Sequence, residues 1–161
     1  MMRRSDLDRF AGDLEEPLRT FVRNTGVRLA LLLNAAGQVL AQHGFQRAVD
    51  VMAIAALGAG VHASSRALAQ LLRQEGFGHL HHVGREQQMF LGSFSTPAEE
   101  LLLLAVFDGR SSFGLVQLFF QDLARHVAAL PGWRTPRPHT DPDAFERELQ
   151  ASLDRLFGPA A

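Results

Sequence analysis

Residues 51–65 read VMAIAALGAGVHASS, and none of these side chains carries a formal charge at neutral pH. A helix without a polar face cannot lie stably with one side in water. Asp50 offers an N-cap and Gly76 a stop, so the pattern predicts a helix over residues 51–74. We expect this helix to be covered on both sides.

The two sides of this helix differ in the size of their side chains. One side carries a bulky stripe, which we expect to pack on a sheet: Ile54, Leu57, Val61, Leu68 and Leu72. The opposite side carries a small stripe: Ala53, Ala56, Gly60, Ala63 and Ala67. A glycine inside a helix costs about 0.5–1 kcal/mol relative to alanine, so Gly58 and Gly60 indicate close packing. We interpret the small stripe as an interface, with coverage by another helix of the same domain as the less favoured alternative.

The segments around this helix predict a complete α+β domain. Apolar residues at helical spacing predict a first helix to about residue 24, either kinked at Pro17 or beginning again there. Segments 28–34 and 38–45 flank Ala35-Ala36-Gly37, which is typical of a hairpin. Strands are predicted over 79–83, 88–94 and 100–107, and Ser111 or Ser112 caps a further helix. The order αββαβββα predicts a single α/β/α sandwich of the profilin-like type, with a five-stranded antiparallel sheet, the long helix on one face and two helices on the other.

The composition changes after residue 130. Four prolines between residues 131 and 142 predict a linker over 131–142, so the domain is expected to span residues 1–130. Residues 143–158 predict a C-terminal amphipathic helix with an apolar stripe: Phe145, Leu149, Leu153, Leu156 and Phe157.

Charge and composition exclude several classes of function. The 161 residues carry a formal net charge of -1, whereas a duplex nucleic-acid binder normally has a basic surplus. The chain contains no cysteine and no lysine, so it has no thiolate ligand, cysteine nucleophile or Schiff-base lysine. The N-terminal residues show no signal peptide, and residues 51–65 are shorter than the roughly 20 that span a bilayer. We expect a cytoplasmic protein without membrane insertion.

The remaining chemical motifs are weak. His79 and His81 lie on one face of a predicted strand, but with His82 they lack a further ligand at a recognised spacing, and we favour an edge-strand or interface role over metal binding. Gly58-Ala59-Gly60 lies inside a helix and lacks the setting of a dinucleotide loop. We expect no enzymatic activity, no metal and no cofactor.

Four segments together carry a resemblance to a known family: LLLNAAGQVLAQHG (31–44), SSRALAQLL (64–72), HHVGREQQMFLGSF (81–94) and LLLLAVFDGRSSFGLVQLFF (101–120). In their order and spacing the chain resembles the roadblock/dynein light chain superfamily, and most closely its bacterial MglB-like members. The resemblance implies a homodimer, or a heterodimer with a related roadblock protein, that extends the sheet across subunits. It also implies a non-catalytic platform that binds a small Ras-like GTPase and modulates its nucleotide cycle, commonly by stimulating hydrolysis.

Carried onto this chain, the resemblance implies that the small stripe and its neighbours form the partner-binding or dimer surface: Ala53, Ala56, Ala59, Gly60, His62, Ala63, Arg66 and Ala67. It implies that neither Arg66 nor Arg110 acts as an arginine finger. Two alternatives remain open: a small-molecule sensor with a pocket between a profilin-like or GAF-like sheet and its helix, and a structural heterodimerisation module that recruits a larger assembly.

Overall fold

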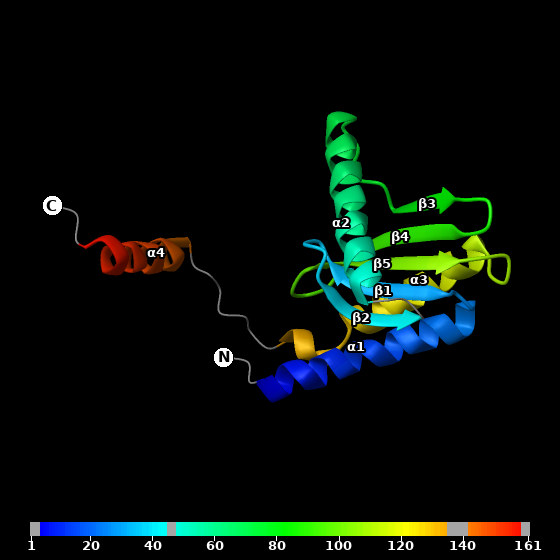
Figure 1. Ribbon diagram of the computed structural model, residues 1–161, viewed down its shortest axis with the longest axis horizontal. Helices are drawn as coiled ribbons and strands as arrows, with labels where there is room; N and C mark the ends of the chain where they lie inside the picture. The colour runs from blue at the N-terminus through cyan, green and yellow to red at the C-terminus, as the bar shows by residue number, and fades with distance from the viewer. Residues whose placement is uncertain (1–3, 45–47, 135–141, 159–161) are drawn as a thin grey trace.

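The fold follows the predicted order of elements. The computed structural model describes residues 4–44, 48–134 and 142–158 (Figure 1). The helices and strands of the domain are α1 (Arg4–Thr25), β1 (Leu29–Asn34), β2 (Val39–Gly44), α2 (Ala48–Leu71), β3 (His79–Val83), β4 (Gln88–Ser95), β5 (Glu100–Phe107) and α3 (Phe113–Ala128). A short 3-10 helix η1 (Pro131–Arg134) and a separate helix α4 (Pro142–Phe157) follow.

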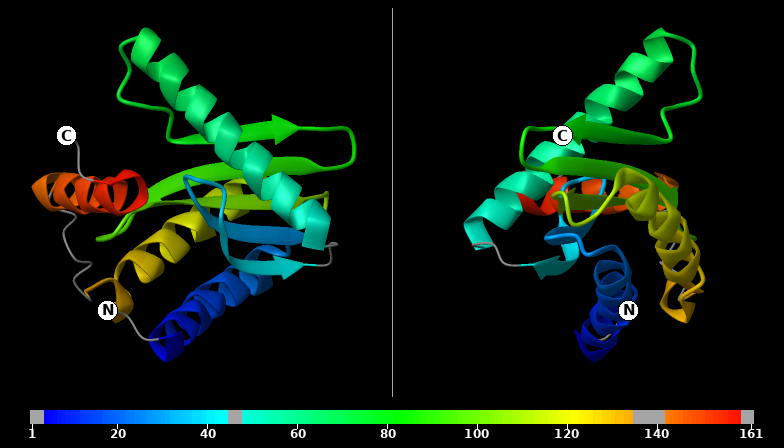
Figure 2. Two further views of the ribbon diagram at one scale, coloured as in Figure 1. Left: turned by 60° about the vertical axis from the view of Figure 1, so that its left-hand side comes forward. Right: turned by 90° about the vertical axis from the view of Figure 1, so that its right-hand side faces the viewer.

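The sheet is the middle layer of the domain. Its five strands are ordered β2-β1-β5-β4-β3, and each neighbouring pair is antiparallel. Helix α2 crosses one face, and α1 and α3 cover the other (Figures 1 and 2). This arrangement confirms the predicted α+β sandwich.

The central strands β1 and β5 are apolar except for Asn34 at the end of β1 and Glu100 at the start of β5, because both faces of the sheet are covered. Leu102 and Leu104 of β5 belong to the core under α2, whereas Leu101 and Leu103 belong to the core under α1 and α3. All four are at most 1% exposed. Such strands lose the polar alternation of a half-exposed strand.

Local caps explain most of the element boundaries. Helix α1 runs unbroken through Pro17 and ends at Gly26, whose φ of 71° is in the left-handed region that glycine adopts readily. In the β1–β2 hairpin, Asn34 Oδ1 accepts hydrogen bonds from the N–H groups of Ala36 and Gln38. Of the two candidate caps of α3, Ser112 is the one that accepts a bond from Leu115 N–H.

Helix α2 is displaced toward the N-terminus relative to its predicted span. It begins at Ala48 and ends at Leu71 rather than at residue 74. Arg73, with a φ of 55°, takes the left-handed conformation that we expected Gly76 to supply. The Gln74 N–H donates to Ala69 O and the Arg73 N–H to Gln70 O, which is the hydrogen-bond pattern of a Schellman motif.

Packing on the core continues past residue 130, where we expected the domain to end. Residues Pro131–Arg134 form η1, and Trp133 is buried in the core under α1 and α3. Its indole Nε1 donates to Val127 O at 2.6 Å, and its ring packs edge-on against Phe10. Trp133 is therefore part of the core that α1 and α3 form with the sheet. The rest of the predicted linker up to residue 141 lies outside the described residues.

Gly92 of β4 lies where α3 packs closely on the sheet. A Cβ atom added at Gly92 would lie 2.8 Å from Phe120 Cζ and 2.8 Å from Phe90 Cε1, and both rings are buried. We expect Gly92→Ala to lower the free energy of unfolding by about 1–3 kcal/mol in urea titrations, because an overpacked core must shift. Gly12→Ala is the control, since nothing lies within 4 Å of its added Cβ on α1. The control should raise stability by about 0.5–1 kcal/mol; a Gly92→Ala variant as stable as the wild type would contradict the packing.

Candidate functional site

The side of α2 that points away from the sheet is exposed and largely apolar. We call it the outer face of α2, and we define it by the exposed apolar residues of the helix together with Arg66: Met52, Ala53, Ala56, Leu57, Gly60, Val61, Ala63, Arg66, Ala67, Leu68 and Leu71. Only Asp50 and Arg66 carry charge within α2. An exposed apolar patch is typical of a surface that contacts another molecule.

The bulky stripe of α2 does not pack on the sheet as predicted. Of its members only Ile54 joins the core, whereas Leu57, Val61, Leu68 and Leu72 are exposed. The side that faces the sheet is instead lined by small residues, with Ala55 and Ala59 buried and a Cβ added at Gly58 lying 2.8 Å from Leu104 Cδ1. The reason is distance, because the α2 backbone lies too close to the leucines of β1 and β5 for a second layer of large side chains.

The structure divides the predicted partner-binding residues into two groups. Six lie on the outer face of α2: Ala53, Ala56, Gly60, Ala63, Arg66 and Ala67. Ala59 and His62 do not, because Ala59 packs against the sheet and His62 turns toward β5. Ala59 and His62 follow Ala55 at spacings of four and seven residues, and this places them on the covered side of the helix.

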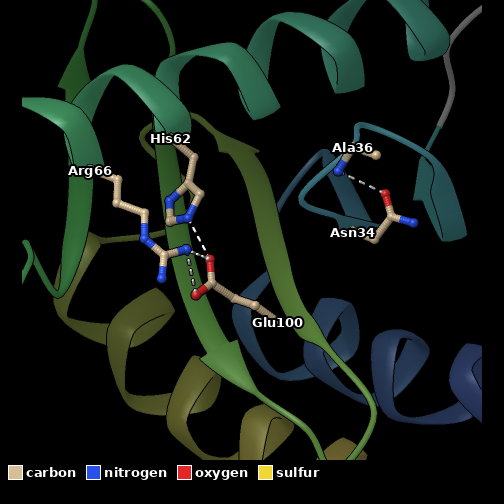
Figure 3. A network of polar contacts seen from close by, with 5 residues as sticks. All are labelled: Asn34, Ala36, His62, Arg66 and Glu100. Atoms are coloured by element: carbon tan, nitrogen blue, oxygen red, sulfur yellow. Dashed lines mark hydrogen bonds and ion pairs between the residues drawn. The ribbon is translucent and has the colours of Figure 1, made fainter. Parts of the chain in front are cut away.

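A polar cluster joins α2 to the first residue of β5. His62 Nε2 lies 2.5 Å from Glu100 Oε1, and Arg66 Nη1 lies 3.3 Å from Glu100 Oε2 (Figure 3). Arg66 donates to the carboxylate, and the ring of His62 shares a hydrogen bond with its other oxygen. Sequence reasoning missed Glu100; its signal was a single acid at the start of an otherwise apolar strand.

The second unpartnered feature is the outer edge of β3. Among the described strands, β3 pairs with β4 alone, so one row of its backbone groups has no strand beside it. The C-terminal half of α2 projects past this edge (Figures 1 and 2). The exposed apolar side chains in this part of the chain are Leu68, Leu71, Leu72, Phe77 and Val83. We call Leu68, Leu71 and Leu72, at the end of α2, the overhang. A free strand edge next to an apolar overhang is a template for pairing with another chain.

Of the three histidines in β3, His79 and His81 pack against aromatic rings, whereas His82 is exposed. His81 stacks on Phe113 at a centroid distance of 4.4 Å and contacts Gln88 Oε1 through Nε2 at 2.7 Å. His79 packs against the rings of Phe90 and Phe113 on the same face of the sheet. Within residues 4–44, 48–134 and 142–158, no three His, Cys, Asp or Glu side chains gather as a metal site would require.

The cavities lie away from the place that a ligand sensor would need. A cavity of about 140 Å³ lies between α1 and α3, lined by Pro17, Thr20, Phe21, Asn24, Phe119, Asp122, Leu123 and His126. A surface hollow of about 550 Å³ lies beside the end of α3 and includes Arg125 and Leu130. Neither lies between α2 and the sheet, so the sensor alternative gains no support from them.

Helix α2 is long and apolar, as a membrane-spanning helix would be. By length and composition, residues Asp50–Leu71 are apolar enough to cross a bilayer. Their packing argues for a domain helix instead, because Val51, Ala55 and Ala59 lie buried against the sheet. A helix with one side docked on strands is not surrounded by lipid.

Comparisons with known proteins identify the domain. The Roadblock/LC7 domain matches residues 13–108, and no curated protein matches the chain. Among solved structures, the gliding protein MglB from Thermus thermophilus is 30% identical, with a TM-score of 0.65 over 74% of this chain and 88% of that one. An MglB with a tetrameric arrangement is 28% identical, with a TM-score of 0.64 over 80% and 91%. Myxococcus xanthus MglB, at 21% identity, has a TM-score of 0.63 over 74% and 92% and shares the fold. The chain therefore belongs to the Roadblock/LC7 family and is similar to MglB proteins.

Proposed function

We propose that this protein is a dimeric, non-enzymatic scaffold in the cytoplasm that binds a small Ras-like GTPase and stimulates its GTP hydrolysis. The observation that carries the proposal is the outer face of α2, an exposed apolar surface on a domain of a regulatory family. Similarity to MglB supports the same role.

The dimer proposal rests on the free edge of β3 and the overhang of α2. Two copies paired edge to edge along β3 would bring the overhang of each α2 over the sheet of the other. This pairing would bury Leu68, Leu71 and Leu72 of one copy against Val83 of the other. A two-fold axis makes such an interface self-complementary, so one apolar patch covers another. A related roadblock protein with the same edge would form a heterodimer instead.

The GTPase would dock on the N-terminal and middle turns of the same helix. Ala53, Ala56, Gly60 and Ala63 leave the backbone of α2 accessible, and nothing lies within 4 Å of a Cβ added at Gly60. A flat surface of this kind admits close approach by a switch segment of the partner. Because switch segments change order with the bound nucleotide, affinity should depend on the nucleotide state.

The test is capture of partners by the tagged dimer in parallel with GDP and with a non-hydrolysable GTP analogue. The GTPase identified in this way is then purified and titrated in both nucleotide states. Single-turnover hydrolysis with and without the scaffold gives the direction of regulation. Binding of a purified small GTPase that favours the analogue supports the proposal, and equal binding in both states contradicts the switch-dependent mechanism.

Replacing Gly60 with arginine should separate docking from folding. We expect Gly60→Arg to weaken binding of the purified GTPase at least about a hundredfold, because a long charged side chain would stand in the centre of the contact. The mass of the scaffold in solution should remain that of the wild type. Gly114→Arg on α3 is the matched control, since Gly114 is also exposed with nothing within 4 Å of its added Cβ. Unchanged GTPase affinity in Gly60→Arg would move the docking site off α2.

A further inference from the structure

The cluster of His62, Arg66 and Glu100 is the polar exception in an apolar layer. The core between α2 and the sheet consists of Leu, Val and Ala side chains with partly buried Ile and Met. Glu100 enters this layer from the start of β5 and bonds to two residues on successive turns of α2 (Figure 3). His62 Nε2 is hydrogen-bonded to Oε1 of Glu100, and the second carboxylate oxygen, Oε2, faces Arg66 Nη1.

In one copy of the chain the ion pair between Arg66 and Glu100 contributes little. The Arg66 side chain is 60% exposed and that of Glu100 is 27% exposed. Water solvates the guanidinium, and an ion pair of this exposure adds little to stability. The geometry nevertheless holds Nη1 within 3.5 Å of both carboxylate oxygens.

Association changes the electrostatics of this pair. Arg66 is the basic residue of α2, and it stands immediately before the exposed Leu68, Leu71 and Leu72 of the overhang. A second copy that pairs along β3 and covers these leucines also takes water away from Arg66. A guanidinium covered without a counter-ion is strongly unfavourable, whereas a paired one is tolerated.

We propose that Glu100 is the internal counter-ion that allows Arg66 to be covered when two copies associate. Each copy brings its own acid, so the surface opposite Arg66 needs no carboxylate. His62 is a positioning residue that fixes the carboxylate. This inference rests on the proposed dimer through β3 and α2.

The test measures the dimer dissociation constant of three variants by sedimentation equilibrium. Glu100→Gln keeps the size of the side chain and an oxygen for His62 but removes the charge. We expect it to weaken the dimer at least about thirtyfold, equivalent to about 2 kcal/mol at 1.4 kcal/mol per tenfold. The double variant Arg66→Met/Glu100→Gln removes the unpaired charge as well and should return to within about threefold of the wild type. Glu16→Gln is the control, because it breaks an ion pair on α1 whose arginine, Arg19, is 58% exposed against 60% for Arg66, and it should leave the constant unchanged.

Thermal unfolding of each variant at a concentration well below its dissociation constant separates this role from a merely structural one. The midpoint of Glu100→Gln monomers should stay close to that of wild-type monomers, since the pair is exposed there. Three results overturn the counter-ion role: an unchanged dimer in Glu100→Gln, a double variant as weak as the single one, or a monomer midpoint that falls in parallel with affinity. A wild-type chain that is monomeric at all concentrations overturns the proposed dimer itself, and this outcome is distinct from the other three.

Discussion

Replacing Leu68 and Leu72 with aspartate is expected to convert the proposed dimer into a monomer, raising its dissociation constant at least about a thousandfold. The two side chains are 50% and 57% exposed in a single chain; Leu68 lies in the last turn of α2, and Leu72 directly follows the end of this helix at Leu71. Fully burying a leucine contributes about 1.5–3 kcal/mol to the free energy of association, and a two-fold dimer buries Leu68 and Leu72 of both copies. Carboxylates at these positions would also be buried without partners.

Sedimentation velocity over a range of protein concentrations checks this result. Leu118→Asp is the matched control, because Leu118 is 56% exposed but lies on α3, on the opposite face of the sheet. The control should sediment like the wild type. A double variant that keeps the wild-type mass would show that the overhang of α2 is not the interface.

The second large effect concerns the end of the domain. We expect Trp133→Ala to lower the free energy of unfolding by about 3–5 kcal/mol, a large part of the roughly 5–15 kcal/mol that stabilises a typical domain. Trp133 is 8% exposed, and its removal leaves a cavity beside Phe10 and leaves Val127 O without its indole donor. Urea unfolding followed by circular dichroism at one protein concentration measures the change.

Phe157→Ala on α4 is the control for this experiment. Phe157 is 82% exposed, so its removal should alter the free energy of unfolding by no more than about 0.5 kcal/mol. A Trp133→Ala variant within about 1 kcal/mol of the wild type would place residues 131–134 outside the cooperative domain, as a linker would be.

Sequence patterns anticipated the elements because their causes are local. The hairpin at Gly37, the cap at Ser112 and the apolar strand Glu100–Phe107 each follow from turn chemistry, capping or burial within a few residues. The packing of Trp133 was not visible in this way, because the four nearby prolines predicted a linker. Prolines exclude long regular structure, but they do not prevent one turn of 3-10 helix from returning an indole to the core.

The sequence by itself determined the order of helices and strands, the antiparallel sheet and the apolar nature of α2, since these depend on periodicity and on turn residues. Only the tertiary structure decided which side of α2 meets the sheet. That choice depends on the distance between helix and strands, which Gly37 and Gly58 keep short through their close approach to Ala56 and Leu104. The contact of Glu100 with Arg66 was decided in the same way, because 34 residues separate the two groups and only the packed sheet brings them together.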